Sequence, residues 1–374
     1  MKPKILLCFE YGTLNGGEFS MLAVLERLIS GPFELLAAAP RSGPLTERLV
    51  QCGIEVQPLT LRDTRDCKRP IDQIDTHLME LITQVAPDLV HANSLAMGRM
   101  VGRIAPQIGL PCTTHLRDII KLSHRAIQDL NQNTGLVAVS QATRQFHVNQ
   151  GIDPDKVQVI YNGVDSNIFQ PRPATGTLKQ QLRLPPDAVL LANIGQICLR
   201  KGQVLLARAA VDLIRSHPQL YVLFIGERHS QKQESLDYEN RIRTIFHQAQ
   251  LDEHVLCLGF REDVVNLLNE IDLLVHAAHQ EPLGRVLLEA AACGQVIVAT
   301  DVGGTAEILT DHVSARLVPS NSIDELKAAI EHLLSHPEDR LRLGQHARQQ
   351  ALKKFSLDTA AAQTRKFWLA KLTA

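Results

Sequence analysis

The sequence predicts an α/β protein built from two doubly wound domains that face each other across a cleft. Its 374 residues are about twice the length of a typical domain. Short apolar runs alternate with amphipathic segments of helix length, which is typical of βαβ units on a parallel sheet. The alternation breaks once, in the turn-rich stretch 162–173, and then starts again. We therefore expect domains over residues 1–170 and 171–356.

In the first domain the strand candidates are almost wholly apolar, as in strands that are covered on both faces. These candidates are Lys4–Phe9, Phe33–Ala39, Ile54–Val56, Asp88–His91, Pro111–His115 and Leu136–Ser140. A helical pattern of apolar residues, from Met21 to Leu28, follows the first of them.

The second domain repeats this alternation. Its strand candidates are Ala188–Ile194, Tyr221–Ile225, Val255–Leu258, Ile271–Val275, Val296–Ala299 and Ala315–Val318. Helices are expected from about Lys201, around Arg241–Ala249 and from about Leu283. Three further helical patterns close the chain, and the last covers about Leu357–Leu372.

The composition narrows the class of protein. Lys and Arg number 39 and Asp and Glu 40, so the net charge of −1 gives no basic field for nucleic acid. The apolar run at the N-terminus is too short for a signal peptide, and no run of about 18 apolar residues occurs. The seven cysteines are scattered with no C-x-x-C spacing, which argues against a disulfide framework and a zinc site. We expect a cytoplasmic protein with reduced thiols.

The densest chemical signal is the segment from Glu281 to Glu289, which follows an apolar strand. Pro282 is expected at the first helical position. The backbone N–H groups that would then form an anion site at the helix N-terminus belong to Gly284, Arg285 and Val286. The two glutamates would lie roughly 12 Å apart on an ideal helix, too far to share a proton but suited to two parts of one ligand. The simpler interpretation is that Glu281 complements the helix dipole and Glu289 is solvated.

Two further segments follow strand candidates. Gly195 to Gly202 places Arg200 and Lys201 at a strand-to-helix junction, where they could neutralise a diphosphate, although this segment by itself favours a simple surface pair of cations. Gly16 and Gly17 form a loop of low steric bulk. His115 ends a strand candidate, where α/β active sites lie, but histidines there are often structural.

The segment 118–131 could form a basic, amphipathic helix. Arg117, Lys121 and Arg125 follow one another at four-residue spacing, and they would share a face if this segment is helical. Such a face could touch anionic lipid at the inner side of a membrane, or an anionic acceptor. Three cations are few for a membrane anchor, so a solvated face is the alternative.

Several motifs in order along the chain resemble the family-4 retaining glycosyltransferases. They are Gly16-Gly17-Glu18, Pro87–His91, His115, Tyr161–Asp165, Lys201-Gly202 and Glu281 to Ile308. The resemblance implies a GT-B fold of two Rossmann-like domains, an acceptor domain followed by a nucleotide-sugar domain, with the last helix packing back onto the first domain.

The resemblance also implies a reaction: transfer of a hexose from a nucleotide-diphosphate sugar to a hydroxyl with retention, and without a metal or other cofactor. Glu281, His115 and Lys201 would serve catalysis, with Glu281 on the sugar hydroxyls and His115 beside the transferred sugar. The residues that would bind the donor are Gly16, Gly17, Gln196, Arg200, Gly284, Arg285, Val286 and Glu289. The acceptor (polysaccharide, lipid or small molecule), the sugar, the base and the oligomeric state stay open.

The sequence departs from the family pattern in the phosphate-binding segment. The family usually has Arg where this chain has Gln196, so Arg200 could replace that cation. The alternatives are a catalytically silent sugar-nucleotide-binding module and a GT-B nucleotide-sugar epimerase. A dehydrogenase is disfavoured because the G-x-G-x-x-G fingerprint is missing.

Overall fold

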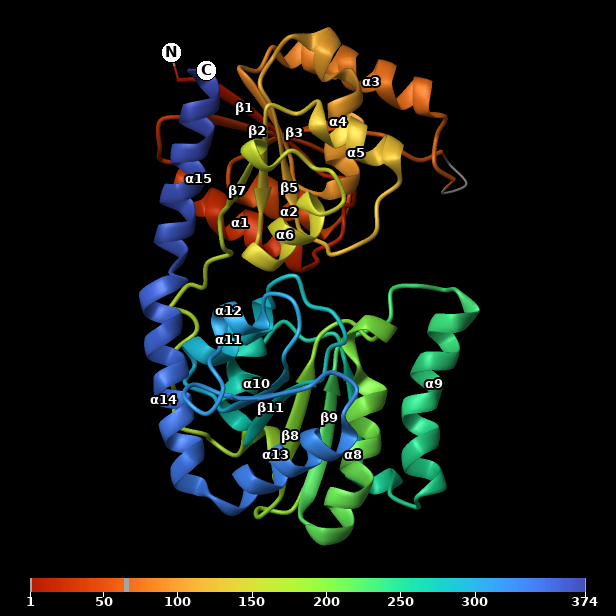
Figure 1. Cartoon of the computed structure of the whole chain (residues 1–374), viewed down its shortest axis with the longest axis vertical. Helices are drawn as coiled ribbons and strands as arrows, with labels where there is room; N and C mark the ends of the chain where they lie inside the picture. The colour runs from red at the N-terminus through yellow and green to blue at the C-terminus, as the bar shows by residue number, and fades with distance from the viewer. Residues whose placement is uncertain (1, 64–66, 374) are drawn as a thin grey trace. The chain divides into compact units, whose positions relative to one another are not determined.

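The computed structural model describes residues 2–63 and 67–373, which form two compact units (Figure 1). Unit 1 comprises Met1–Gly163 and Leu357–Ala374, and unit 2 comprises Val164–Ser356. The division therefore falls a few residues before the expected position near residue 170. The reason is local: Val164 bridges to Ser356, and its N–H donates to the Phe355 carbonyl at 2.9 Å.

Unit 1 contains a parallel sheet with the strand order β3-β2-β1-β4-β5-β6-β7. The strands are β1 (Lys4–Cys8), β2 (Glu34–Ala39), β3 (Glu55–Pro58), β4 (Leu89–Ala92), β5 (Cys112–Leu116), β6 (Gly135–Ala138) and β7 (Val157–Val159). The first six match the strand candidates, but β7 was not expected. It has only three residues, of which Val157 alone is buried, so it carries no visible apolar run.

Helices cover both faces of this sheet. They are α1 (Gly16–Leu28), α2 (Pro44–Gln51), α3 (Ile71–Val85), α4 (Leu95–Ile108), α5 (His124–Asn131), α6 (Gln141–Val148) and α15 (Leu357–Leu372), with a 3₁₀ turn, η1, at Pro154–Lys156. One apolar cluster joins α1, α2 and α15 to the sheet, and another joins α3 and α4 to it. The C-terminal helix α15 thus belongs to the core of unit 1, where the Trp368 ring meets Phe33 edge-on.

Unit 2 contains a second parallel sheet with the order β10-β9-β8-β11-β12-β13. The strands are β8 (Val189–Ile194), β9 (Leu220–Ile225), β10 (Val255–Gly259), β11 (Leu273–His276), β12 (Ile297–Thr300) and β13 (Arg316–Val318). Each overlaps its predicted strand. The two doubly wound α/β folds that the sequence predicts are therefore present.

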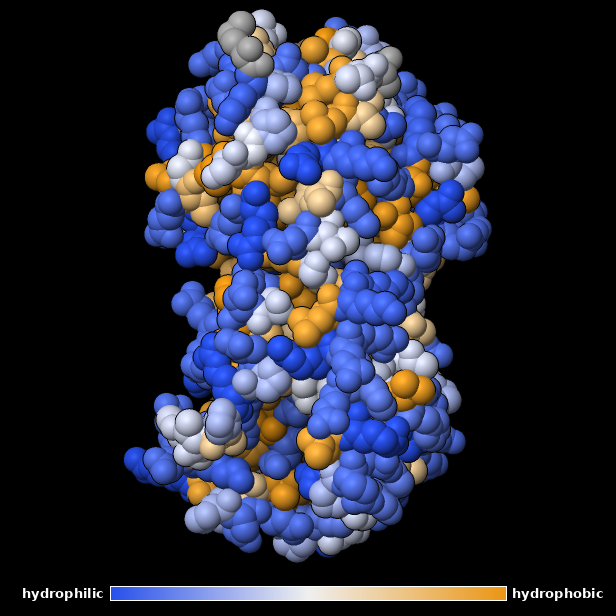
Figure 2. All heavy atoms as spheres, turned by 90° about the vertical axis from the view of Figure 1, so that its left-hand side faces the viewer, coloured by the Kyte–Doolittle hydropathy of each residue, from blue (hydrophilic) through white to orange (hydrophobic). Residues whose placement is uncertain are grey.

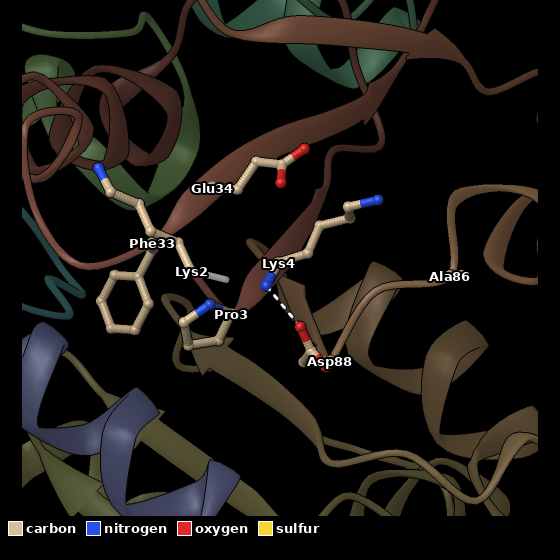
Figure 3. Close-up of a pocket in the computed structure, with 7 residues that line it drawn as sticks. All are labelled: Lys2, Pro3, Lys4, Phe33, Glu34, Ala86 and Asp88. Carbon is tan, nitrogen blue, oxygen red and sulfur yellow. Dashed lines mark hydrogen bonds between the residues drawn. The ribbon is translucent and has the colours of Figure 1, made fainter.

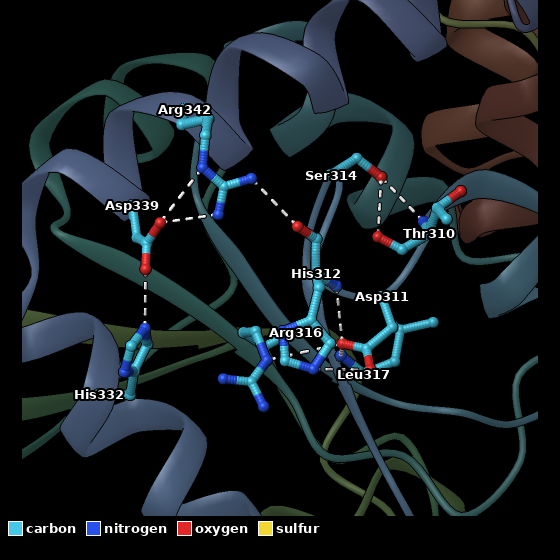
Figure 4. A network of polar contacts seen from close by, with 9 residues as sticks. All are labelled: Thr310, Asp311, His312, Ser314, Arg316, Leu317, His332, Asp339 and Arg342. Atoms are coloured by element: carbon cyan, nitrogen blue, oxygen red, sulfur yellow. Dashed lines mark hydrogen bonds and ion pairs between the residues drawn. The ribbon is translucent and has the colours of Figure 1, made fainter.

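The helices of unit 2 are α7 (Thr177–Gln181), α8 (Gln203–Ser216), α9 (Gln233–Gln248), α10 (Val264–Glu270), α11 (Arg285–Ala292), α12 (Thr305–Ile308), α13 (Ile323–Ser335) and α14 (Pro337–Lys354), with 3₁₀ turns η2 (Leu199–Lys201) and η3 (Asp252–His254). A polar network connects the turn before β13 with helices α13 and α14 (Figure 4). Arg342 donates to Asp339 and to the His312 carbonyl, while Asp339 also accepts from His332 at 2.8 Å.

In both sheets the strand order reverses beside the first strand, between β1 and β4 and between β8 and β11. Ligands of open α/β sheets bind outside the carboxyl ends of the strands at such a reversal. A cavity of about 750 Å³ lies at the opposite, amino ends of β1 and β2, beside the hydrogen bond from the Lys4 N–H to Asp88 (Figure 3). Its position makes it a poor candidate for the main site.

The helices that the structure describes were compared with the length and hydropathy that a membrane span requires. Within residues 2–63 and 67–373, every helix is too short or too polar to cross a lipid bilayer. On the face drawn in Figure 2, groups of hydrophobic residues are interrupted by hydrophilic ones, as is usual for protein surfaces.

Candidate active site

The junction between β8 and α8 brings the predicted cations to the carboxyl end of the central strand of unit 2. Residues 199–201 form the turn η2, and Gly202 then adopts φ 66° to start α8. A Cβ atom on Gly202 would lie 1.8 Å from the Ala277 carbonyl oxygen. Because only glycine fits this close approach, the junction packs directly against the segment that follows β11.

The segment after β11 carries Glu281 into contact with Lys201. The two side chains form a hydrogen-bonded ion pair, and both are largely buried, with 12% and 6% of the Lys201 and Glu281 side chains exposed. The same Glu281 oxygen, Oε2, lies 2.8 Å from Nε2 of His276, the last residue of β11. The structure thus brings two predicted site residues, Lys201 and Glu281, into direct contact and adds His276, which was not predicted.

Electrostatics keep this carboxylate ionised. Burial opposes the charge on Glu281, but the Lys201 ammonium and the hydrogen bond from His276 outweigh it and hold the pKa of Glu281 well below its usual range. Burial and the Lys201 charge lower the pKa of His276. A neutral His276 with a proton on Nε2 can donate to Glu281.

No motif in the sequence marks His276, so its contact with Glu281 was not predicted. The available signal was its position at the end of a strand, five residues before Glu281. In the described ranges, no three His, Cys, Asp or Glu side chains come together in a way that could hold a metal ion.

The helix that follows Glu281 starts later than predicted. Gly284, with φ 96°, caps α11, and Arg285 and Val286 are its first residues, so Pro282 lies in the preceding turn. A hydrogen bond from another segment holds this turn in place: the Gly304 N–H donates to the Glu281 carbonyl at 2.9 Å. The first residue of α11, Arg285, thus follows Glu281 by only a few positions in the chain.

Glu289 is buried in α11 rather than solvated. Its Oε1 lies 2.7 Å from Nε of Arg285, one helical turn earlier. Burial raises the pKa of Glu289, and the Arg285 charge partly offsets that effect. Glu281 and Glu289 each have a cationic partner of their own, Lys201 and Arg285, so they are two separate groups and not a dyad.

Arg200 and Gln196 both lie in the segment between β8 and α8. The Arg200 backbone carbonyl accepts the His279 N–H at 2.8 Å, while its side chain forms no ion pair in the described part of the chain. The Gln196 carbonyl accepts from Gln203, at 2.9 Å. Both residues are half-buried, and the Arg200 charge contributes to the low pKa of His276.

In unit 1, Gly16 and Gly17 are the first two residues of α1 and not loop residues as expected. Asn15 precedes them, and its N–H donates to Glu18 at 3.1 Å. A Cβ on Gly17 would lie 3.0 Å from Cδ of Arg117, so this glycine keeps the helix end close to that side chain.

Arg117 joins the carboxyl ends of several strands and is not part of a basic helix face. It donates to the Asn93 carbonyl and side chain at 3.0 and 2.9 Å and to Asn162 at 3.1 Å. Helix α5 begins only at His124, after the Ser123 cap. Residues 118–123 are not helical, so the predicted shared face of Arg117, Lys121 and Arg125 is wrong.

His115 lies in β5 and contacts His91, of the neighbouring strand β4. Nδ1 of His115 is 2.8 Å from Nε2 of His91, and both rings are buried. Burial and the charge of Arg117 lower the pKa of His91 to about 3 and hold the pKa of His115 well below its usual range. Both imidazoles are therefore neutral near pH 7.

Comparison with known proteins supports the interpretation of these motifs. Residues 175–350 match the family model described as glycosyl transferases group 1, and residues 14–168 match glycosyltransferase family 4. The chain is 32% identical over 204 residues to D-inositol 3-phosphate glycosyltransferase of Saccharomonospora viridis, covering 53% of this chain but only 46% of that relative. It is 24% identical to UDP-Gal:alpha-D-GlcNAc-diphosphoundecaprenol alpha-1,3-galactosyltransferase of Escherichia coli, over 85% and 84% of the two chains.

Solved structures share the fold. Anabaena Alr3699/HepE in complex with UDP and glucose superimposes with a TM-score of 0.87 at 23% identity, covering 98% of this chain and 99% of that one. A glycosyltransferase from Rickettsia africae gives a TM-score of 0.83 at 19% identity, over 99% of both chains. At these identities the likeness establishes the fold, which is GT-B. With family models matching both units, the chain belongs to the group 1, family-4 glycosyltransferases.

Proposed function

We propose that the protein transfers a hexose from a nucleotide-diphosphate sugar to an acceptor hydroxyl, with retention at the anomeric carbon and without a metal. The observation that carries the proposal is the buried contact between Lys201 and Glu281 at the carboxyl ends of β8 and β11. The identity of the acceptor, whether a polysaccharide, a lipid or a small molecule, stays open.

The charges at this site fit the bond that must break. Cleavage of the sugar–phosphate bond leaves negative charge on the diphosphate and positive character on the sugar. Lys201 and the N-terminus of α11 would stabilise the first charge from fixed positions. The family usually has a second cation, an Arg, at the position of Gln196. Arg200, half-buried beside Lys201, would supply that charge in this chain.

Glu281 suits a binding role better than an acid–base role. Its low pKa keeps it a carboxylate, which only accepts hydrogen bonds and can therefore hold sugar hydroxyls. We infer same-face attack, in which the donor phosphate takes the proton of the acceptor hydroxyl, so that no enzymic nucleophile is needed. Buried Glu289 would hold the ribose.

UDP-sugars are the first donors to test. One relative is named as a transferase that uses UDP-Gal, and crystal structures of Alr3699/HepE contain UDP and UDP-glucose. A binding panel of UDP, GDP, ADP and their common sugars, with and without EDTA, should give an EDTA-insensitive rise in melting temperature with one base. No shift with any nucleotide would contradict the donor site proposed here, whereas a shift in a protein that transfers no sugar would support the silent-module alternative.

Transfer itself is tested with Glu281→Gln, which removes the charge but keeps the size of the side chain. We expect turnover of the matching donor to fall at least a hundredfold, while the exposed Glu253→Gln leaves it unchanged. Retention is read from the anomeric configuration of the first product by NMR. Near-normal turnover of the Glu281 variant would contradict its assigned role, and donor epimerisation without an acceptor would indicate an epimerase.

A further inference from the structure

We propose that Trp368 and His91 form a hydrogen-bond relay that fixes His115 in one tautomer, with its proton on Nε2. His115 then presents a hydrogen-bond donor, and not a base, to the bound ligand. The nature of that ligand rests on the proposed function, whereas the relay is a property of unit 1 alone.

Three side chains from separate parts of unit 1 form the relay. Nε1 of Trp368, in α15, lies 3.2 Å from Nδ1 of His91, in β4. Nε2 of His91 lies 2.8 Å from Nδ1 of His115, in β5. The rings of each neighbouring pair meet edge-on, with centroids 5.3 and 4.9 Å apart. Trp368 and His91 are fully buried and His115 is 5% exposed, so bulk water does not compete for these contacts.

The direction of the relay follows from the chemistry of indole. An indole N–H can only donate, so Nδ1 of His91 must accept from Trp368. A neutral imidazole carries a proton on one nitrogen only, which places the His91 proton on Nε2. Nε2 therefore donates to Nδ1 of His115. His115, also neutral, must then carry its own proton on Nε2.

Trp368 is the residue that selects this direction. The Thr113 hydroxyl also lies 2.8 Å from Nδ1 of His91, and it can either donate to that nitrogen or accept from it. The Val90 carbonyl, 3.3 Å from the same hydroxyl, offers an alternative acceptor for its proton. Without the indole N–H, His91 could protonate Nδ1 towards Thr113, and the relay could reverse.

The outcome matters because Nε2 of His115 is the ring atom that is left for a ligand. In the ranges that the structure describes, it has no hydrogen-bond partner in the protein. With a proton fixed there, it can bind an acceptor such as a sugar hydroxyl oxygen or a phosphoryl oxygen. His91 and Trp368 are positioning residues in this scheme, and Trp368 brings a function to the C-terminal helix.

The test reads the tautomer directly. Histidine labelled with ¹³C at Cδ2 gives different shifts for the Nε2–H and Nδ1–H forms, and the His115 signal is assigned by its loss in His115→Gln. We expect the Nε2–H form in the unmodified protein. Trp368→Phe, which keeps an aromatic ring but removes the N–H, should shift His115 towards the other form and lower kcat/KM about 3- to 10-fold. Phe33→Leu loosens the packing on the indole but keeps its N–H, so it should leave the tautomer unchanged.

A second pair of variants covers the case in which Trp368→Phe folds poorly. His91→Gln keeps an amide oxygen for Trp368 and an amide N–H for His115, and it should restore much of the activity that His91→Leu loses. An Nδ1–H form of His115 in the unmodified protein would overturn the relay, as would equal tautomer shifts in Trp368→Phe and Phe33→Leu. An Nε2–H form in a protein that transfers no sugar would support the relay and contradict the proposed function.

Discussion

At the scale of single residues, Glu281 makes a testable contribution to stability. The pKa of Glu281 is lower in the folded chain than its ordinary value of 4.5, so its stabilising effect is complete above that value and is lost as the pH falls below it. In Glu281→Gln this loss should disappear. We expect the fall in unfolding free energy between pH 6 and pH 3 to be smaller in the variant by about 2 kcal/mol, because each of the roughly 1.5 pH units below 4.5 corresponds to about 1.36 kcal/mol for one carboxyl group.

The measurement is urea unfolding at a series of pH values, with Glu253→Gln as the control. Glu253 is exposed, so its loss should leave the acid limb of the stability curve unchanged. An acid limb in Glu281→Gln as steep as that of the unmodified protein would show that the Lys201 contact does not stabilise the carboxylate.

A second prediction at this scale concerns which side chain, besides Lys201, binds the diphosphate. Arg200 carries a full charge and has no ion pair among the described residues, whereas Gln196 can only form neutral hydrogen bonds. Arg200→Ala should therefore weaken UDP binding by about 1.5–3 kcal/mol, and Gln196→Ala by about 0.5–1.5 kcal/mol. Isothermal titration calorimetry separates the two ranges. A larger loss in the Gln196 variant would assign the diphosphate contact to that residue.

At the scale of the element, the β8–α8 junction depends on Gly202. Gly202→Ala would bring Cβ to 1.8 Å from the Ala277 carbonyl oxygen, in addition to the strain of a positive φ. Gly176 has φ 75° and open space around its missing Cβ, so Gly176→Ala isolates the strain alone, about 1–2 kcal/mol. We expect Gly202→Ala to lower the unfolding free energy by clearly more than that and to abolish UDP binding. Equal losses in the two variants would contradict the close approach.

Elements differ in how far the sequence predicts them. Strands buried on both faces carry continuous apolar runs, so all but one of the strands were predicted, and β7 was missed because its Gln158 is exposed. Helix α5 was predicted to begin too early, because charges at four-residue spacing suggested a helix that the Ser123 cap in fact starts later.

The contacts within the candidate site were predicted less well than the strands. The Glu281-to-Glu289 segment and Lys201 were visible as motifs, but their partners were not. His276 reaches Glu281 only through the turn after β11. Trp368 reaches His91 across 277 positions of the chain, and no periodic pattern can show such a contact.

At the scale of the whole molecule, each unit has apolar clusters of its own, and one cluster of unit 1 includes the last helix of the chain. Phe367 and Trp368 of α15 lie in the same apolar cluster as β1, β2 and α1. The core of unit 2 is formed by a different set of residues, among them Phe224 and Phe246. The two units should therefore respond independently to changes in their cores.

Paired substitutions of buried phenylalanines test this independence. Phe367 is 3% exposed and Phe246 is fully buried, and Phe→Ala in a core costs about 3–5 kcal/mol. In calorimetry, Phe367→Ala should lower the transition of unit 1 and Phe246→Ala that of unit 2. Since Lys201, Glu281 and Glu289 all belong to unit 2, UDP should raise the same transition that Phe246→Ala lowers. A UDP-dependent rise confined to the transition lowered by Phe367→Ala would place the nucleotide on unit 1 and overturn the assignment of the donor site.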